Sequence, residues 1–213
     1  MCDVSAPFAL ITQHPDLLLS RRLMAKLYFR YAAMNAGKST QLLQIEHNYA
    51  ALQRKALLLT SHVDDRFGEG RITSRLGMSR PAEVYSVDTD MYDRIQRFLD
   101  EARESLGAVL IDEAQFLTQE QVCQIHRAVH RLNVPVLCFG LRSDFRGMPF
   151  AGSTMLLTLA ESIEEIKNVC ACGAKATMNM RCDQNGDRLR EGPQVLVGDA
   201  NYQQVCARCF YAD

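Results

Sequence analysis

The stretch 31-YAAMNAGKSTQLL-43 limits the possible folds of this chain more than any other feature of the sequence. Gly37, Lys38 and Ser39 stand in the order of a phosphate-binding loop, whose full pattern is G-x-x-x-x-G-K-[ST]. Ala32 occupies the position of the first glycine, so we expect the backbone there to avoid a positive φ, which a β-carbon disfavours. By itself the stretch has two interpretations: a phosphate loop, or a plain helix start capped by Ser39.

Apolar segments on both sides of this loop alternate in a regular way. Short apolar runs typical of strands alternate with stretches that repeat apolar residues at helical spacing. Strands are predicted at residues 26–32, 55–61, 108–113 and 134–141, and helices at about 38–53, 91–106 and 118–132. This order predicts an α/β fold with a parallel sheet and right-handed crossovers. Residues 64–77 are charged and glycine-rich, and we expect a mobile loop there.

Composition excludes several classes of protein. The 213 residues have a formal net charge of −1, so no overall basic field recruits nucleic acid or an anionic membrane. No apolar run is long enough to span a bilayer, and residues 1–24 have the wrong order of charged and apolar segments for a secretion signal. We therefore expect a flexible extension at 1–24, a core at 25–168 and a small subdomain at 169–213.

The segment 108-AVLIDEAQF-116 ends a predicted strand with two carboxylates. Ligands of open α/β sheets bind at the carboxyl ends of strands. Asp112 fits a carboxylate that holds Mg²⁺ in nucleotide-binding loops, and Glu113 fits a general base toward an incoming hydroxyl. An isolated Asp-Glu pair is more often a solvated turn, but together with the loop it predicts nucleotide binding.

Two close pairs of cysteines, 170-CAC-172 and 206-CARC-209, occur near the C-terminus. Thiolate pairs that converge from separate segments suit a tetrahedral zinc site of structural type. This use of cysteine indicates a reducing compartment and hence a cytoplasmic protein. His126 and His130 also have a metal-compatible spacing, but no H-E-x-x-H glutamate accompanies them, and a solvated helix face is the favoured interpretation.

Together, 28-YFRYAAMNAGKST-40, 112-DEAQF-116, 140-GLRSDFRGMPF-150 and the cysteine pairs resemble the type II, cytosolic thymidine kinase family. The resemblance runs from about residue 25 to the C-terminus. It implies a RecA-like core with a small zinc-containing subdomain that carries a "lasso" loop. The implied reaction is ATP-dependent phosphorylation of the 5′-hydroxyl of thymidine, with deoxyuridine as a further candidate, in nucleoside salvage for DNA synthesis. In this family the position of Ala32 tolerates a small residue other than glycine.

The resemblance also implies roles for individual residues. Glu113 would be the catalytic base, and Cys170, Cys172, Cys206 and Cys209 would bind zinc. ATP and phosphate would contact Met34, Asn35, Ala36, Gly37, Lys38, Ser39, Thr40 and Arg66, and Mg²⁺ would be held by Ser39, Asp64 and Asp112. Thymidine would contact Met34, Phe116, Leu141, Phe145, Asn179, Val195, Val197, Gly198 and Tyr202. The lasso reads VLVGDANY, one residue shorter than in many relatives.

The resemblance further implies a homotetramer and feedback inhibition by thymidine triphosphate, and no nucleic acid or membrane among the partners. Three other functions compete with the kinase interpretation. A RecA-type motor on DNA conflicts with the near-neutral charge, and a GTPase lacks its N-K-x-D guanine motif. A zinc-ribbon interaction module would leave Lys38, Ser39, Asp112 and Glu113 unexplained.

Overall fold

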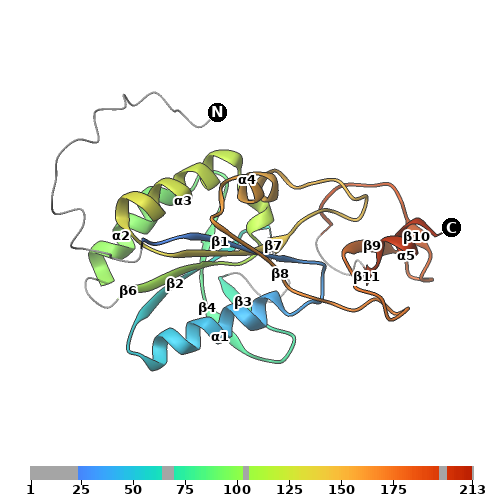
Figure 1. Ribbon diagram of the computed structural model, residues 1–213, viewed down its shortest axis with the longest axis horizontal. Coiled ribbons are helices and arrows are strands. Elements are labelled where there is room, and N and C mark those ends of the chain that lie inside the picture. Colours follow the sequence, from blue (N-terminus) through green and yellow to red (C-terminus); the bar gives the residue numbers. More distant parts are fainter. Residues whose placement is uncertain (1–23, 64–69, 103–105, 197–200, 213) are drawn as a thin grey trace.

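The computed structural model describes residues 24–63, 70–102, 106–196 and 201–212 (Figure 1). A six-stranded sheet forms its centre, in the order β5-β2-β6-β7-β1-β8. The strands are β1 (Leu27–Ala32), β2 (Lys55–Ser61), β5 (Glu83–Tyr85), β6 (Leu106–Ile111), β7 (Val136–Leu141) and β8 (Ser162–Glu165). Every neighbouring pair in this sheet is parallel, which confirms the predicted α/β class.

Helices cover both faces of the sheet because its central strands are apolar on both sides. Helices α2 (Met91–Ala102), α3 (Gln119–Leu132) and α4 (Ala151–Leu159) lie on one face, and α1 (Lys38–Ala51) lies on the other (Figure 1). Successive strand residues point to opposite faces: Val109 and Ile111 pack toward the first group of helices, and Ala108 and Leu110 toward α1. No helix among the described residues has both the length and the apolar character needed to cross a membrane.

Several element ends differ from the prediction. The helix expected to reach residue 106 ends at Ala102, and the strand expected at 108–113 spans Leu106–Ile111 instead. Helix α1 ends at Ala51, and the chain turns at Gln53 with a φ of 58°. Such ends depend on local backbone turns that hydrophobic spacing does not record.

The prediction of a loop over residues 64–77 is wrong at residues 71–73, which form a strand. Strand β3 (Arg71–Thr73) pairs antiparallel with β4 (Ser79–Pro81), and the hairpin turns at Gly77, which has a φ of 88°. Only Ile72 of β3 is buried, where it packs with the residues between α1 and the sheet. Strands of three residues with one apolar contact leave too little periodicity to predict.

The C-terminal segment builds a second, smaller sheet. Strand β9 (Met178–Cys182) lies between β10 (Arg188–Leu189) and β11 (Asn201–Val205), and the short helix α5 (Ala207–Tyr211) follows. Its small apolar cluster consists of Cys170, Ala176, Val205, Cys206 and Phe210. One cysteine of each pair, Cys170 and Cys206, therefore belongs to this buried cluster, whereas Cys172 is exposed.

Candidate active site

The loop of residues 33–37 joins the end of β1 to the start of α1. Ala32 is the last residue of β1, and its backbone is not among those with a positive φ, as predicted. The left-handed turns fall instead on Asn35, with a φ of 63°, and on Gly37, with a φ of 82°. Asparagine and glycine are the residues that adopt this conformation most readily. The chain thus turns without the missing glycine.

Ser39 does not cap α1. The N-cap residue is Gly37, and the Ser39 hydroxyl donates a hydrogen bond of 2.7 Å to Oδ2 of Asp112. This bond joins the loop to the residue that follows β6, because β1 and β6 both flank β7 and end at the same edge of the sheet. The plain helix-start interpretation is therefore wrong, and the serine and aspartate form the predicted pair.

Asp112 lies almost fully buried beneath the loop. Its Oδ1 accepts a 3.0 Å hydrogen bond from the backbone N–H of Glu113. Burial and then the charge of Glu113 raise the pKa of Asp112 to about 7, against the opposing effects of the Ser39 hydroxyl and the Lys38 charge. A buried carboxylate beside a hydroxyl is an all-oxygen ligand set, so these residues fit Mg²⁺.

The backbone of Glu113 is held in an unusual conformation. Its φ is 51°, and its carbonyl accepts a 2.9 Å hydrogen bond from the hydroxyl of Tyr85. Its Oε2 accepts a 2.5 Å hydrogen bond from Nε2 of Gln115, whose Oε1 accepts the backbone N–H of Leu141 at 3.0 Å. Buried Gln115 thus fixes the Glu113 carboxylate relative to the end of β7.

Gly140 provides the space for this arrangement. A β-carbon there would lie 2.9 Å from Oε1 of Gln115 and 3.0 Å from its backbone nitrogen. Sequence reasoning missed the role of Gln115, although the residue stands inside the quoted DEAQF motif. A glutamine two residues after an acidic pair has no distinctive pattern, and only the fold brings it to β7.

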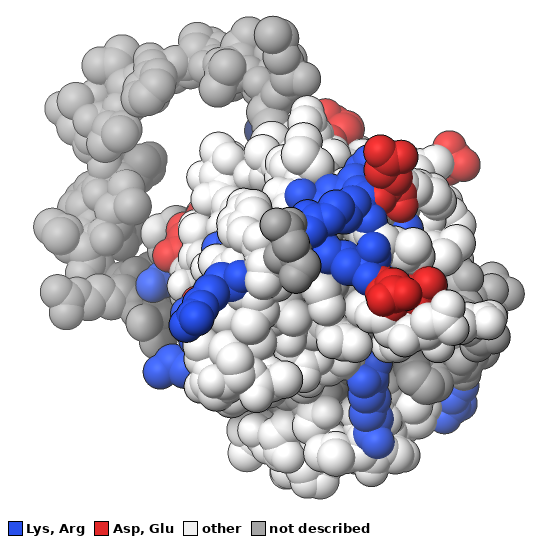
Figure 2. Space-filling view, turned by 90° about the vertical axis from the view of Figure 1, so that its right-hand side faces the viewer, with Lys and Arg blue, Asp and Glu red and all other residues white. Residues whose placement is uncertain are grey.

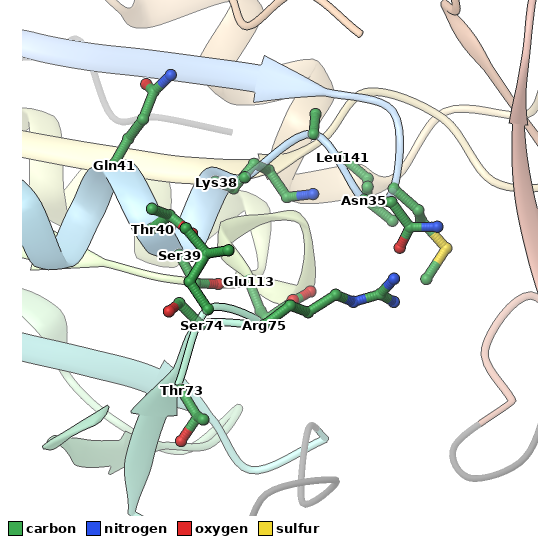
Figure 3. Close-up of a pocket in the computed structure, with 14 residues that line it drawn as sticks. Asn35, Lys38, Ser39, Thr40, Gln41, Thr73, Ser74, Arg75, Glu113 and Leu141 are labelled. Carbon is green, nitrogen blue, oxygen red and sulfur yellow. The ribbon is translucent and has the colours of Figure 1, made fainter. Parts of the chain in front are cut away.

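A cavity of about 480 Å³ opens between the loop and the β3–β4 hairpin (Figure 3). One wall consists of residues 34–41, and the opposite wall consists of residues 73–76, with Glu113 and Leu141 between them. The buried Lys38 side chain places Nζ 3.5 Å from the carbonyl oxygen of Ala33, inside the loop. Arg75 extends along the cavity from the hairpin side. Sequence reasoning missed residues 73–76 because it assigned them to a loop.

Other predicted substrate residues form a second group outside this cavity. The guanidinium carbon of Arg181 lies 3.7 Å from the ring centre of buried Phe145, and its nitrogens donate to the Tyr202 hydroxyl. Arg181 also donates to the carbonyls of Pro193 and Gln194, which directly precede the half-buried Val195. Phe116 packs edge-on against Phe150, with ring centres 5.9 Å apart. Arg181 thus joins Phe145, Tyr202 and the segment before Val195, and no sequence pattern had identified it.

Asn179 connects the two groups. Its Oδ1 accepts the Met34 backbone N–H at 2.7 Å, and its Nδ2 donates to the Ser143 carbonyl at 3.0 Å. The Met34 carbonyl accepts Nδ2 of Asn168 at 3.0 Å, and Asn35 donates to Gln204 on β11 at the same distance. The loop is therefore held by the C-terminal segment as well as by the central sheet. The predicted residues Asp64, Arg66, Val197 and Gly198 lie outside the described residues.

The four paired cysteines converge on one point. The sulfur atoms of Cys170, Cys172, Cys206 and Cys209 all lie within 4.8 Å of one another, and those of Cys172 and Cys206 are 3.6 Å apart. Zinc–sulfur bonds of about 2.3 Å place tetrahedral sulfur atoms roughly 3.8 Å apart. Backbone hydrogen bonds from Cys172 and Cys206 lower the pKa of Cys170 to about 6, whereas hydrogen bonds with the other thiols raise the pKa of Cys209 to about 12, so it is the convergence of the four sulfur atoms that supports a metal. The cluster fits zinc.

Charge on the surface near the C-terminal sheet is mixed. Figure 2 looks onto this end of the molecule and shows basic and acidic side chains next to one another, with uncharged surface between the groups.

Comparison with known proteins identifies relatives of this chain. The family model described as "Thymidine kinase" matches residues 25–210. A protein named "Thymidine kinase" from Chromobacterium violaceum is 53% identical over 191 residues, which cover 89% of this chain and 100% of that protein. Proteins of the same name from Salmonella paratyphi A and Escherichia coli O157:H7 are 46% and 44% identical, each over 88% of this chain and 91% of theirs.

Among solved structures, the X-ray structure of the Legionella pneumophila ATPase DotB matches with a TM-score of 0.40 and 13% identity. The match covers 76% of this chain and 47% of that chain. The fold assignment rests on the sheet order and the loop geometry described above.

Proposed function

The chain belongs to the thymidine kinase family, and from this premise we propose that it transfers the γ-phosphoryl group of ATP to the 5′-hydroxyl of thymidine. The products are thymidine monophosphate and ADP, and deoxyuridine is a candidate second substrate. The observation that supports the proposal is the cavity lined by the phosphate loop and Glu113, in which Ser39 hydrogen-bonds to the buried Asp112 beneath the loop.

ATP binds with its phosphates in the loop. Backbone N–H groups at the start of a helix such as α1 can bind the phosphate oxygens of ATP. The Lys38 ammonium adds a positive charge at the β- and γ-phosphates. We propose that residues 34–40 and Arg66 contact ATP, and that Ser39, Asp112 and Asp64 hold Mg²⁺. Bound Mg²⁺ would neutralise the charge that develops on the phosphate oxygens.

Glu113 acts as the general base. Its carboxylate takes the proton of the 5′-hydroxyl as that oxygen forms a bond to the γ-phosphorus and the bond to the ADP oxygen breaks. Phosphoryl transfer depends mainly on positioning and charge. The hydrogen bond from Gln115 supports this role, because it holds the carboxylate at the cavity before substrate arrives.

Thymidine occupies the space next to the loop and the lasso. We propose that Met34 and Leu141 border the sugar and base, and that Phe116, Phe145, Asn179, Val195, Val197, Gly198 and Tyr202 complete the pocket. Met34 and Leu141 support this location, because they line the same cavity as Glu113. Zinc at the four cysteines anchors the two ends of the lasso, since ordering an unpacked segment of this length is costly.

One assay tests the reaction directly. Purified protein is incubated with Mg·ATP and separately with thymidine, deoxyuridine, deoxycytidine or deoxyguanosine, and monophosphate formation is measured. We expect product with thymidine. If no nucleoside monophosphate forms and DNA stimulates ATP hydrolysis, the kinase function is wrong. A DNA-dependent ATPase would then be the better interpretation.

A single substitution tests the base. Glu113→Gln keeps the shape of the side chain and removes its ability to accept a proton, so we expect turnover to fall by more than about a hundredfold while ATP binding is preserved. Turnover rates from product formation and ATP affinity from calorimetry separate the two effects. An unchanged kcat would remove Glu113 from the mechanism.

Assembly and regulation are also proposed from the family resemblance. We infer a cytoplasmic homotetramer that binds no nucleic acid or membrane and is inhibited by thymidine triphosphate, which would span the ATP and thymidine sites. Light scattering measures the mass in solution. Inhibition competitive with both substrates is the expected kinetic result, and a monomeric mass would contradict the assembly.

A further inference from the structure

Three metal-binding side chains converge at the edge of the sheet opposite the phosphate loop. His126 and His130 stand one turn apart on α3, and Glu161 follows α4. The Oε1 atom of Glu161 lies 3.2 Å from Nε2 of His126 and 2.7 Å from Nε2 of His130, and the two Nε2 atoms are 3.2 Å apart. Both histidines remain partly exposed on α3, as predicted, and Glu161 from outside the helix lies beside them.

This cluster could not be predicted from the sequence. A metal site on one helix needs a third ligand, and the sequence near His126 offered none at the expected spacing. Glu161 comes from another element, and its side chain is 30% exposed beside histidines that are 33% and 36% exposed. All three groups remain partly accessible to an ion from solution.

The separations between the ligand atoms fit a single small ion. Bonds of about 2.0 to 2.2 Å from nitrogen and oxygen to zinc place neighbouring ligands roughly 3 to 3.5 Å apart. The two separations of 3.2 Å lie in this range. The 2.7 Å separation between Glu161 and His130 would have to lengthen by only a few tenths of an ångström. Each histidine also presents the same ring nitrogen, Nε2, to the shared point.

The cluster is held by contacts outside it, as ligands of metal sites commonly are. Oε2 of Glu161 accepts a 2.6 Å hydrogen bond from the backbone N–H of Leu27, the first residue of β1. This bond leaves Oε1 directed at the histidines. The two imidazole rings pack edge-on with centres 4.6 Å apart, which restricts the rotation of both.

We propose that His126, His130 and Glu161 form a second metal site, separate from the cysteine cluster, that binds a divalent transition-metal ion of the zinc or nickel type. Imidazole ligands favour these ions over magnesium and calcium, which prefer oxygen. Three protein ligands leave the remaining coordination positions to water on the exposed side. A bound ion would tie α3 to the start of β1 and stabilise the native state by mass action.

The test starts from protein that already holds one equivalent of zinc, so that the cysteine cluster is occupied. Nickel or cobalt chloride is then titrated in by calorimetry, and the melting temperature is measured with and without the ion. We expect one further equivalent to bind and the melting temperature to rise. The cobalt form should lack the thiolate charge-transfer absorption that binding at cysteines would produce.

Variants assign the second equivalent to these residues. His130→Ala and Glu161→Gln should each weaken the second binding event by at least about tenfold, and the glutamine retains an oxygen for the Leu27 N–H. His47→Ala, which removes an exposed histidine on α1, is the matched control and should bind as the unmodified protein does. Failure of the zinc-loaded protein to bind a second ion, or undiminished binding by both variants, would overturn the proposal. Neither readout depends on kinase activity.

Discussion

Gln115 shows how a single buried amide can set the geometry of the carboxylate that we propose as the general base. It connects Oε2 of Glu113 to the backbone N–H of Leu141, so the carboxylate cannot turn away without breaking a bond. Gln115→Met keeps the side-chain length and removes both bonds. We expect kcat to fall by about a hundredfold with little change in KM for ATP, because misplacement of a reacting group costs this much.

The matched control for this positioning residue is Gln44→Met on the exposed side of α1, which should leave both constants unchanged. Steady-state kinetics with varied ATP and thymidine give the comparison. A proportional loss of folded protein with an unchanged kcat per folded molecule would show that Gln115 acts only on stability.

The pKa of Asp112 predicts how magnesium binding depends on pH. In the metal-free protein burial raises this pKa to about 7, so the carboxyl group is increasingly protonated below that pH. Because the metal needs the carboxylate, a proton competes with it, and we expect the Mg²⁺ requirement for ATP binding to rise as pH falls from 8 to 6. Titrations of Mg²⁺ at fixed ATP measure the effect, and Asp112→Asn should remove the pH dependence.

The raised pKa of Asp112 also affects the free energy of unfolding. The effect of pH has the opposite sign to that of an ordinary ion-paired aspartate. The folded pKa lies above the unfolded value, so between about pH 4 and pH 7 the folded state binds more protons. The Asp112 contribution to the free energy of unfolding therefore decreases as pH rises through this window when Mg²⁺ is absent. Thermal melts across this pH window in magnesium-free buffer compare the stability of the zinc-loaded protein with that of the zinc-loaded Asp112→Asn variant.

At the scale of elements, the β3–β4 hairpin supplies a wall of the phosphate cavity. Arg75 extends along this cavity, opposite the loop that carries Lys38. We expect Arg75→Ala to raise KM for ATP about five- to tenfold with a smaller effect on KM for thymidine, because its positive charge lies on the phosphate side. Arg71→Ala on the same hairpin, outside the cavity lining, is the control, and an equal effect of both variants would contradict the assignment.

The elements that the sequence predicts are those whose patterns are long. Residues 26–32 and 55–61 are confirmed as β1 and β2, since apolar runs buried on two faces have few alternatives. β5 and β8 escaped prediction because short strands at the sheet edges carry little apolar pattern. The pairing of Ser39 with Asp112 was predictable from strand order, whereas the contacts of Gln115 and Arg181 depend on side chains from distant segments.

Across the whole molecule, the two sheets meet at the phosphate loop. Asn179 and Gln204, from β9 and β11, bond to Met34 and Asn35. The segment around the cysteines therefore holds the backbone of the phosphate loop, and under the proposed function it would also anchor the lasso. A change at the zinc cluster should reach both substrate sites.

Zinc removal tests this connection. The apolar cluster around the cysteines is too small to order the segment alone, so stripping zinc should loosen β9 and β11 while the parallel sheet and its helices remain. We expect KM to rise for thymidine and, to a lesser degree, for ATP, since Met34 and Asn35 lose their partners. Helical circular dichroism should stay close to that of the zinc-loaded protein. Cys209→Ser should reproduce the effect without chelator, and full activity of protein shown to be zinc-free would mean that the cluster does not support the loop.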